Sequence, residues 1–326
     1  MNKENILEIL KSKSGEIVSG GYISMKLNIS RNAVWKNINT LKKEGYDIIS
    51  VKNKGYMLDS NVSYLNKKEI FKHLETKYIG NKTEILDRVD STLNYIKNLK
   101  EDEKVEGMVV ISDEQTGGRG RRGRSFFSPK DSSIYLSILL KPRFSLSDIN
   151  LITVICGISV VSAVKKVTGI DCDIKWVNDV FIDGRKICGI LTEGILSVEN
   201  GSIDSVIIGV GINVNRPEKE NVPEELKNII GFINDYTNKT ENRNKIIAEF
   251  LNEFEKRYLQ LDKNILYKEY KEKMLYLNEN IECYMGKEKL NGTLVDLNKD
   301  FSIKVITDSG EVKNFNSGEI SIRRNN

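Results

Sequence analysis

Residues 116–127 read TGGRGRRGRSFF, and this short stretch contains four glycines and four arginines. Arginines separated by single glycines give a loop that can move and that offers several planar donor groups to carboxylates and phosphates. Such a loop could form a phosphate-binding cradle, a basic tract for nucleic acid, or a lid over an acidic small molecule. For a lid, we expect disorder without an anionic ligand and order with one.

The flanking sequence separates these three alternatives. The spacing from Gly118 to Ser125 approaches the Walker pattern G-x-x-x-x-G-K-[ST], with arginine in place of the lysine. A P-loop follows an apolar strand and opens a helix whose N-terminus holds the phosphate. Here SDEQTG precedes the stretch, and FFSPKDSS, with a proline and turn formers, follows it. The stretch also lies between two predicted strands, whereas basic nucleic-acid tracts usually lie in tails or on helix faces. The flanks therefore favour the lid.

Few other residue types are available for catalysis. The single histidine, His73, lies in a polar helical stretch, where we expect a solvated surface position. The four cysteines show no paired spacing, which argues against a disulfide framework and against a zinc site. Chemistry in this chain must therefore proceed without a histidine base, which disfavours Ser–His and Cys–His hydrolases.

Composition indicates a soluble globular chain of two or three domains, since 39% of the 326 residues are hydrophobic and 29% are charged. No apolar run approaches the ~20 residues that span a bilayer, and the N-terminus lacks the apolar core of a signal peptide. We therefore expect a cytoplasmic protein without a membrane partner. The net charge is only +4, but basic residues concentrate at 31–54 and 119–124, so basic function should be local.

The N-terminal residues follow the order of a winged helix-turn-helix. An amphipathic helix over 3–12 precedes a helix near 20–27 that stops at Asn28, and Ser30 is placed to cap a further helix that Gly45 ends. That further helix buries one stripe, formed by Val34, Ile38 and Leu41. Two short apolar strands, near 48–51 and 56–58, are joined by the turn KNKG.

This order predicts DNA binding. The basic helix would enter the major groove, and the lysine-rich hairpin would contact phosphates. The alternative is a small helical domain with a solvated basic face. The residues expected to contact DNA are Ser30, Arg31, Asn32, Lys36, Asn39 and Lys54.

Beyond a linker expected at 60–71, the chain alternates helices and strands. Strands are predicted near 107–115, 132–140, 171–177, 186–196 and 205–214, and helices over 146–169, 243–260 and 265–275. Asp183-Gly184 is a strong two-residue hairpin signal, so part of the sheet must be antiparallel. This favours a mixed α+β domain over a doubly wound one. Short alternating segments at the end of the chain indicate a small β-barrel.

The stretch QTGGRGRRGRSFFSP resembles the signature loop of biotin protein ligases. Further motifs agree in order, namely Asp90-Ser91-Thr92, IKWVNDV (174–180), GRKICGILTE (184–193) and IIGVGINVN (207–215). With its winged helix, the chain resembles the bifunctional type, which is both a ligase and the repressor of the biotin operon. The resemblance covers essentially the whole chain. It implies an α+β fold with a winged helix-turn-helix over 1–62, a class II synthetase-like ligase domain over 63–275 and an SH3-like barrel over 276–326.

The resemblance also implies roles for individual residues. Contacts to biotin would come from Ser91, Thr92, Leu93, Gln115, Arg119, Gly120, Arg121 and Lys186. Contacts to the nucleotide would come from Arg121, Arg124, Asn178 and Asn213. Catalysis would depend on Lys186, which reaches the biotin carboxylate and the α-phosphate, on Arg121, and on Asp179, which orients the acceptor lysine.

In the implied reaction a biotin carboxylate approaches the α-phosphate of ATP, and the two anions repel each other. Arginines and one lysine would screen that repulsion and stabilise the developing charge. Magnesium on the phosphates would assist, and no metal site made by protein ligands is expected. Biotinyl-5′-AMP would then pass biotin to a lysine of a biotin carboxyl carrier protein domain. In the family the bound adenylate also promotes homodimerisation on operator DNA, and we expect the same coupling here.

Two positions depart from the family pattern. Val177 replaces a common proline, which loosens a turn but removes no functional group. Leu93 stands where asparagine is frequent, so its contact to biotin would be apolar or through its backbone. Ser91 and Thr92 could also cap the following helix. Two other functions stay open: a lipoate or octanoate ligase, which would lack the GRGRRGR loop, and a ligand-sensing repressor without ligase chemistry.

Overall fold

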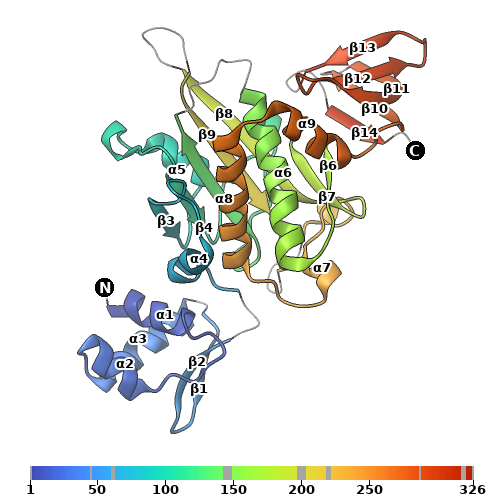
Figure 1. The fold of residues 1–326 in the computed structure, drawn as a ribbon. Coiled ribbons are helices and arrows are strands. Elements are labelled where there is room, and N and C mark those ends of the chain that lie inside the picture. Colours follow the sequence, from blue (N-terminus) through green and yellow to red (C-terminus); the bar gives the residue numbers. More distant parts are fainter. Residues whose placement is uncertain are drawn as a thin grey trace.

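Three structural units follow one another along the chain (Figure 1). The computed structural model describes residues 2–44, 46–59, 63–141, 149–196, 203–217, 222–285, 288–316 and 321–324. Within these residues, a helical unit with a hairpin is followed by a central sheet with helices and by a C-terminal unit of strands.

The N-terminal unit is a winged helix-turn-helix, as predicted. Its elements are α1 (Asn2–Lys11), α2 (Gly20–Leu27), α3 (Arg31–Lys43), β1 (Ile48–Val51) and β2 (Gly55–Leu58). The three helices close on one core because each turns its apolar residues inward, and Val34, Ile38 and Leu41 of α3 are fully buried in it. Asn28 ends α2 in the left-handed conformation, with φ 51°.

Local chemistry fixes the start of α3 and the shape of the wing. The Ser30 hydroxyl accepts a hydrogen bond from the Ala33 N–H at 3.1 Å, which satisfies one free donor of the helix N-terminus. Gly55, with φ 142°, closes the hairpin, and a Cβ at this position would lie 2.2 Å from the Val18 carbonyl oxygen. Only glycine therefore fits at the base of the wing. Gly45, predicted to end α3, lies outside the described residues.

The central unit is built on a mixed sheet with the order β3-β4-β5-β9-β8-β7-β6. Its strands are β3 (Thr83–Leu86), β4 (Val109–Ser112), β5 (Ile134–Leu140), β6 (Asp173–Lys175), β7 (Asp179–Ile182), β8 (Arg185–Leu196) and β9 (Ile203–Ile212). The β3–β4 pair is parallel and the other pairs are antiparallel. Asp183 and Gly184 both have positive φ and join β7 to β8, which confirms the predicted hairpin.

The two faces of this sheet carry different helices. Figure 1 shows α6 (Ile149–Thr168), α8 (Arg243–Gln260) and α9 (Lys263–Glu272) on one face. Among the described helices, α6 is apolar and long enough over Asn150–Thr168 to cross a membrane, but 72% of that window is buried in the protein, as in a core helix. The opposite face packs against α5 (Thr92–Asn98) through a separate apolar cluster that includes Leu93, Val110 and Ile207.

The C-terminal unit is a five-stranded antiparallel sheet, consistent with the predicted SH3-like unit. Its strands are β10 (Asn280–Met285), β11 (Glu288–Leu297), β12 (Ile303–Thr307), β13 (Val312–Phe315) and β14 (Ser321–Arg324), in the order β13-β12-β11-β10-β14. Trp176 donates a hydrogen bond from Nε1 to the Phe301 carbonyl at 3.0 Å, and the Tyr270 ring of α9 meets the Phe301 ring edge-on. These contacts join the C-terminal unit to Trp176, which is part of the motif KWVND of the central unit, and to α9.

Some boundaries differ from the prediction. The helix α4 (Lys67–His73) begins inside the expected linker 60–71, because the Asn66 side chain caps it by accepting from the N–H groups of Lys68 and Glu69. His73 is exposed at the end of α4, as expected. Residues 60–62 and 146–148 lie outside the described residues. The last predicted helix starts at Lys263 and stops at Glu272, before a turn in which the Leu275 N–H donates to the Ile174 carbonyl.

Candidate functional site

A cleft lies on the α5 face of the central sheet, at the middle strands. Its floor includes Gly189 of β8 and Gly209 and Gly211 of β9. The loop 116–127 covers it. A second cavity of about 270 Å³ continues the cleft under that loop. The residues that line both parts are Gly120, Arg121, Phe126, Asn178 and Lys186. The cleft therefore has two ends that meet at charged residues.

The residues predicted for biotin, the nucleotide and catalysis all line this cleft. The first end is lined by every residue predicted to contact biotin: Ser91, Thr92, Leu93, Gln115, Arg119, Gly120, Arg121 and Lys186. The second end is lined by Arg121, Arg124, Asn178, Asp179, Lys186 and Asn213, the residues predicted for the nucleotide and for catalysis. The structure thus brings together side chains that lie up to 122 positions apart in the sequence, from Ser91 to Asn213.

A buried polar cluster forms the inner end of the cleft. Gln115 accepts from the Thr92 N–H at 2.9 Å and from the Thr92 hydroxyl at 3.2 Å. The Thr92 hydroxyl also lies 2.8 Å from the Ser137 hydroxyl, and Gln115 donates to Ser128 at 3.2 Å. These hydroxyl and amide groups are fixed in position before any ligand arrives, which suits recognition of a polar ring.

The expectation that Ser91 or Thr92 caps α5 through its side chain is wrong. Ser91 occupies the cap position, but its side chain makes no capping hydrogen bond, and Thr92 turns its hydroxyl toward Gln115. The local sequence favours a cap, whereas the tertiary neighbours draw these side chains to the cleft. Leu93 is 6% exposed, packs with Ile96 and Met108, and lines the inner end of the cleft.

The loop 116–127 folds back on itself in the structure. Gly120 N–H donates to the Arg124 carbonyl at 2.7 Å, and Phe126 N–H donates to the Gly118 carbonyl at 2.9 Å. Arg119 and Arg124 are exposed, whereas Arg121 is half-buried. The Phe126 ring lies against the glycine floor, since a Cβ at Gly211 would come within 2.4 Å of it. The loop therefore places the half-buried Arg121 and the Phe126 ring where the two ends of the cleft join, while its exposed arginines line one end only.

A chain of polar contacts crosses the junction between the two ends of the cleft. Arg121 donates to the Asn178 side-chain oxygen at 2.8 Å, and Asn178 donates to Asp179 at 3.1 Å. Lys186 pairs with Asp179, with 2.7 Å between Nζ and Oδ1. Burial lowers the pKa of Arg121, although Asp179 opposes this effect. The side chains of Arg121 and Lys186 are thus held near the Asp179 carboxylate in a partly desolvated position. An anion that enters this position would interact strongly with both cations.

Sequence reasoning missed several residues of the cleft. Ser137 is the one serine in β5, IYLSILL, where every residue is buried. A small hydroxyl residue in such a strand is a usable signal, because a buried hydroxyl needs a partner. Gly209 and Gly211 alternate along β9, and Gly189 of β8 pairs with Gly211, which also could have indicated close approach of a ligand.

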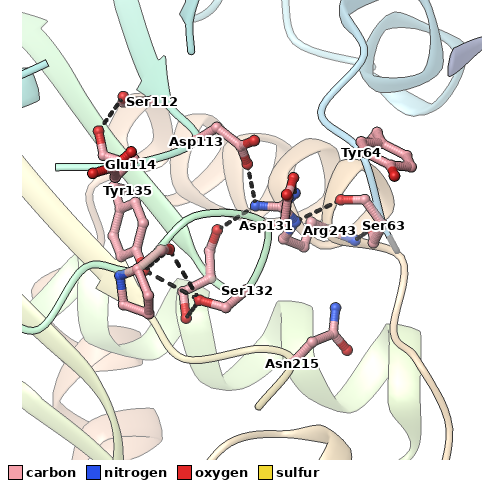
Figure 2. A network of polar contacts seen from close by, with 12 residues as sticks. Ser63, Tyr64, Ser112, Asp113, Glu114, Asp131, Ser132, Tyr135, Asn215 and Arg243 are labelled. Carbon is pink, nitrogen blue, oxygen red and sulfur yellow. Dashed lines mark hydrogen bonds and ion pairs between the residues drawn. The ribbon is translucent and has the colours of Figure 1, made fainter. Parts of the chain in front are cut away.

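A buried network near the central sheet holds the segment that follows the winged helix (Figure 2). Arg243, the first residue of α8, is fully buried and donates from Nη1 to Asp113 at 2.7 Å and to the Ser133 carbonyl at 2.9 Å. Its Nε donates to the Ser63 carbonyl at 2.7 Å. Its Nη2 lies 4.0 Å from Oδ1 of Asp131. The Arg243 guanidinium therefore holds the segment at Ser63, which follows the winged helix, against two other segments. These are Asp113, just after the end of β4, and Ser133, just before β5.

A second contact links α3 itself to the central unit. Tyr46 follows α3, and its hydroxyl donates to Asp87 at 3.1 Å. The Lys130 ammonium lies 4.4 Å from the centre of the Tyr46 ring, a cation–π distance. Asp87 precedes the Asp90-Ser91-Thr92 segment, and Lys130 follows Ser128, the partner of Gln115. Tyr46 thus touches two segments that also supply the cleft.

The predicted DNA-contacting residues lie on the outer side of the winged helix. Arg31, Asn32 and Lys36 of α3 are exposed, and Lys54 is exposed in the turn of the wing. Asn39 is half-buried. Ser30 is exposed, but its hydroxyl already caps α3.

The described residues contain no group of three or more His, Cys, Asp or Glu side chains that could hold a metal ion.

Comparisons with known proteins match both parts of the chain. Residues 85–213 match the biotin/lipoate A/B protein ligase family, and residues 2–57 match a helix-turn-helix domain. The chain is 37% identical over 256 residues to the bifunctional ligase/repressor BirA of Bacillus spizizenii, covering 78% of each protein. It is 28% identical over 313 residues to the Escherichia coli protein of that name, covering 95% of this chain and 94% of the other. The solved biotin protein ligase from Aquifex aeolicus, in complex with biotin and ATP, is similar with a TM-score of 0.65 and 31% identity over 75% of this chain and 100% of that chain.

Proposed function

Since this chain belongs to the family of bifunctional ligase/repressors, we propose that it joins biotin to a lysine of a biotin carboxyl carrier protein and represses biotin genes from operator DNA. It is a biotin protein ligase that uses ATP and carries a helix-turn-helix repressor domain. The carrier protein, the operator contacts and the residue roles below are our proposals.

In the first step a carboxylate oxygen of biotin attacks the α-phosphorus of ATP, pyrophosphate leaves, and biotinyl-5′-AMP forms. Biotin lies at the inner end of the cleft, with its ureido ring on Ser91, Thr92 and Gln115, and the nucleotide lies under the loop. The carboxylate and the phosphate then meet at Lys186 and Arg121. Both cations are already anchored, Lys186 on Asp179 and Arg121 on Asn178, so little reorganisation is needed during the reaction.

In the second step the amine of the acceptor lysine attacks the carbonyl carbon of the adenylate, AMP leaves, and an amide forms. The amine must arrive uncharged and lose a proton after attack. Asp179 lies at the mouth of the cleft, 23% exposed, where its carboxylate can orient the amine and accept the proton. The folded-back loop keeps water from the anhydride meanwhile.

Magnesium enters, in our proposal, with the phosphates of ATP. The only carboxylate that lines the outer end of the cleft is that of Asp179, which is paired with Lys186, and the described residues offer no acidic cluster. Such a site fits an ion that keeps its waters and takes most of its ligands from the substrate. When bound, the ion would neutralise charge on the phosphates.

The observation that carries the proposed function is the meeting of Arg121, Asn178, Asp179 and Lys186 where the two ends of the cleft join. We would mix the protein with ATP, magnesium, biotin and a carrier domain and follow the carrier by mass spectrometry. A biotin adduct on one lysine is expected. An adduct with lipoate but none with biotin would favour the lipoate ligase, and no adduct with either would favour the repressor without chemistry.

Replacing Thr92 by valine should weaken biotin binding while leaving the shape of the cleft. The change removes the hydroxyl that contacts Gln115 and Ser137 and leaves both with fewer partners. We expect the KM for biotin to rise about ten- to a hundredfold with a smaller change in kcat. Thr153→Val is the matched control, since it removes from α6 a similar hydroxyl pair with Thr192 of β8. Equal KM values for the two variants would contradict the role of Thr92.

We also propose that ligand occupancy strengthens operator binding and promotes a homodimer. Tyr46 offers a route, since it joins the end of α3 to the segments around Asp87 and Lys130 that lead into the cleft. Arg243 offers another, since it holds Ser63 against Asp113, two residues before Gln115.

Tyr46→Phe tests this coupling. The variant loses the bond to Asp87 but keeps the ring under Lys130, so we expect the gain in operator affinity caused by biotin and ATP to shrink about five- to tenfold. Fluorescence anisotropy of labelled operator DNA, with and without both substrates, measures that gain. Tyr95→Phe, which breaks a similar tyrosine–carboxylate bond to Glu84 within the central unit, should leave it unchanged. An unchanged gain in Tyr46→Phe would argue against this route.

The domain limits 1–62, 63–275 and 276–326 and a cytoplasmic location complete the proposal. Arg31, Asn32, Lys36, Asn39 and Lys54 remain our candidates for DNA contact. Ser30 is better described as the helix cap, because its hydroxyl is engaged with Ala33.

A further inference from the structure

The outer face of α3 carries a large exposed aromatic ring. Trp35 is 56% exposed, and in the described part of the chain it makes no hydrogen bond, ion pair or ring contact. The second tryptophan of the chain, Trp176, is 4% exposed and hydrogen-bonded to Phe301. A single exposed apolar residue needs no explanation by itself. The surroundings of Trp35 supply one.

Trp35 lies between two asparagines on one side of the helix. Asn32 precedes it by three positions and Asn39 follows it by four, a spacing that places all three side chains along one face. Neither asparagine side chain makes a hydrogen bond within the described residues. Asn37, by contrast, donates to the Ala33 carbonyl and is satisfied by its own helix. The face therefore offers two free amide groups with an indole ring between them.

This face suits DNA and repels a second copy of itself. The helix RNAVWKNINTLKK has four basic residues and no acidic one. Arg31 and Lys36, close to Trp35 in the sequence, are exposed, as is Lys43 in the last turn of the helix. Two such faces would bring like charges together, whereas a duplex is an anion with phosphates on both sides of the major groove. The positive charge of this helix face thus favours a nucleic acid, rather than a second copy of the chain, as its binding partner.

The chemistry of the three side chains selects the bases. Asparagine recognises adenine through paired hydrogen bonds to N6 and N7, and an apolar side chain recognises the 5-methyl group of thymine, both in the major groove. Adenine and thymine occur in the same base pair, so amides flanking an indole match a short run of A·T pairs. We propose that Trp35 is a specificity-determining residue that packs on a thymine methyl group of the operator, beside adenines held by Asn32 and Asn39. This inference rests on the proposed repressor function.

The test removes one methyl group at a time. Duplexes that bind the wild-type full chain with biotin, ATP and magnesium would first be selected from a random pool. Each thymine of the selected sequence would then be replaced by uracil, which lacks only the 5-methyl group. At one or two positions we expect the wild-type protein to bind about fourfold more weakly, as burial of about one methyl group predicts.

Trp35→Ala supplies the second arm of a double-mutant cycle. We expect this variant to bind the selected duplex at least tenfold more weakly and to lose its sensitivity to the uracil substitution. Because Trp35 is exposed and far in sequence from the cleft, ligase activity and the unfolding temperature should be unchanged. Trp35→Phe should restore part of the affinity, and Phe71→Ala, which removes an exposed ring from α4, should leave it intact.

Each outcome decides between hypotheses. Equal weakening of Trp35→Ala on thymine and uracil duplexes would show that Trp35 contacts backbone rather than methyl, and full affinity of Trp35→Ala would remove it from the interface. Either result overturns this inference and leaves the repressor intact. Failure of the wild-type protein to select any duplex would instead overturn the repressor function, and this inference with it.

Discussion

Lys186→Met is expected to reduce biotin-dependent exchange of labelled pyrophosphate into ATP by about a thousandfold or more. Lys186 lies where the two ends of the cleft join, paired with Asp179 at 2.7 Å. In the proposed reaction the biotin carboxylate and the α-phosphate meet there, and without the ammonium group Arg121 is the one anchored cation left at that junction to screen their repulsion. Methionine keeps much of the aliphatic volume, so loss of charge is the main change.

The adjacent residue provides a matched control for Lys186. Arg185→Ala removes a neighbouring cation that is exposed, lines neither end of the cleft, and donates to the Lys227 carbonyl at 3.4 Å. Its exchange rate should stay within about twofold of the wild type. Lys186→Arg keeps the charge but not the compact ammonium, so partial activity is expected. Normal exchange in Lys186→Met would contradict the assigned role, and loss in both Lys186→Met and Arg185→Ala would point to folding instead.

Arg243→Met is expected to destabilise the central unit by about 3 to 5 kcal/mol. Its guanidinium is fully buried, and Asp113, its partner at 2.7 Å, is 5% exposed. Removing the cation leaves that carboxylate and the Ser133 and Ser63 carbonyls without their donor inside the protein. Calorimetry should record a melting temperature lower by on the order of 10 °C for this transition.

A second substitution distinguishes the buried charge from loss of packing. In the Arg243→Met, Asp113→Asn double variant the unpaired carboxylate is gone, so part of the lost stability should return. No recovery would mean that the guanidinium matters through its shape and its bonds to Ser63 and Ser133. Release of the segment around Ser63 should also make the single variant more sensitive to proteolysis between the winged helix and α4.

The same network predicts a dependence on pH. Burial raises the pKa of Asp131 to about 7, and the neighbouring Asp113 carboxylate adds to the effect, whereas Arg243 and Lys130 oppose it. The folded protein therefore holds this proton more tightly than the unfolded chain between about pH 4 and 7. The stability that this bound proton contributes is fully present below about pH 4. It is lost as the pH rises from there to about 7, by at most ~1.4 kcal/mol per pH unit.

Asp113 works in the opposite direction. Burial alone would raise the pKa of Asp113, but the charge of Arg243 and hydrogen bonds outweigh it and lower the pKa. Its ionised carboxylate therefore stabilises the folded protein at neutral pH, and this stabilisation is lost as the pH falls. Asp131→Asn isolates the first effect, and asparagine tolerates the left-handed backbone at this position, with φ 61°. When the free energy of unfolding is measured with urea between pH 5 and 8, it should fall less steeply with pH in this variant than in the wild type.

Sequence patterns were sufficient to predict the helices and the hairpin of the N-terminal unit, because the residues that determine them lie close together in the chain. A cap at Ser30, an apolar stripe at Val34, Ile38 and Leu41, and a glycine at the hairpin fix the helices and wing within a few residues of one another. The Asp183-Gly184 turn likewise settled the antiparallel pairing of β7 and β8. The loop composition and the ordered motifs were enough to predict the ligase family and many of the residues that line the cleft.

Local rules failed where distant neighbours compete with them. Ser91 sits at the start of α5, yet its side chain does not cap the helix, and Thr92 bonds Gln115 and Ser137 from other strands instead. The bonds of Arg243 to Ser63, Asp113 and Ser133 join positions more than a hundred residues apart, and no spacing in the sequence predicts them.

The sequence by itself determined most of the elements and the family and supplied the candidate site residues, because periodicity, caps, turns and motifs act over a few residues. The tertiary structure alone decided that the arginines of TGGRGRRGRSFF are not equivalent. Arg121 is drawn into the cleft by Asn178, while Arg119 and Arg124 stay exposed. It also decided that the winged helix touches the segments that bear the cleft. Both depend on which surfaces meet when the units pack, and hydrogen bonding between distant buried groups, rather than local propensity, selects those pairs.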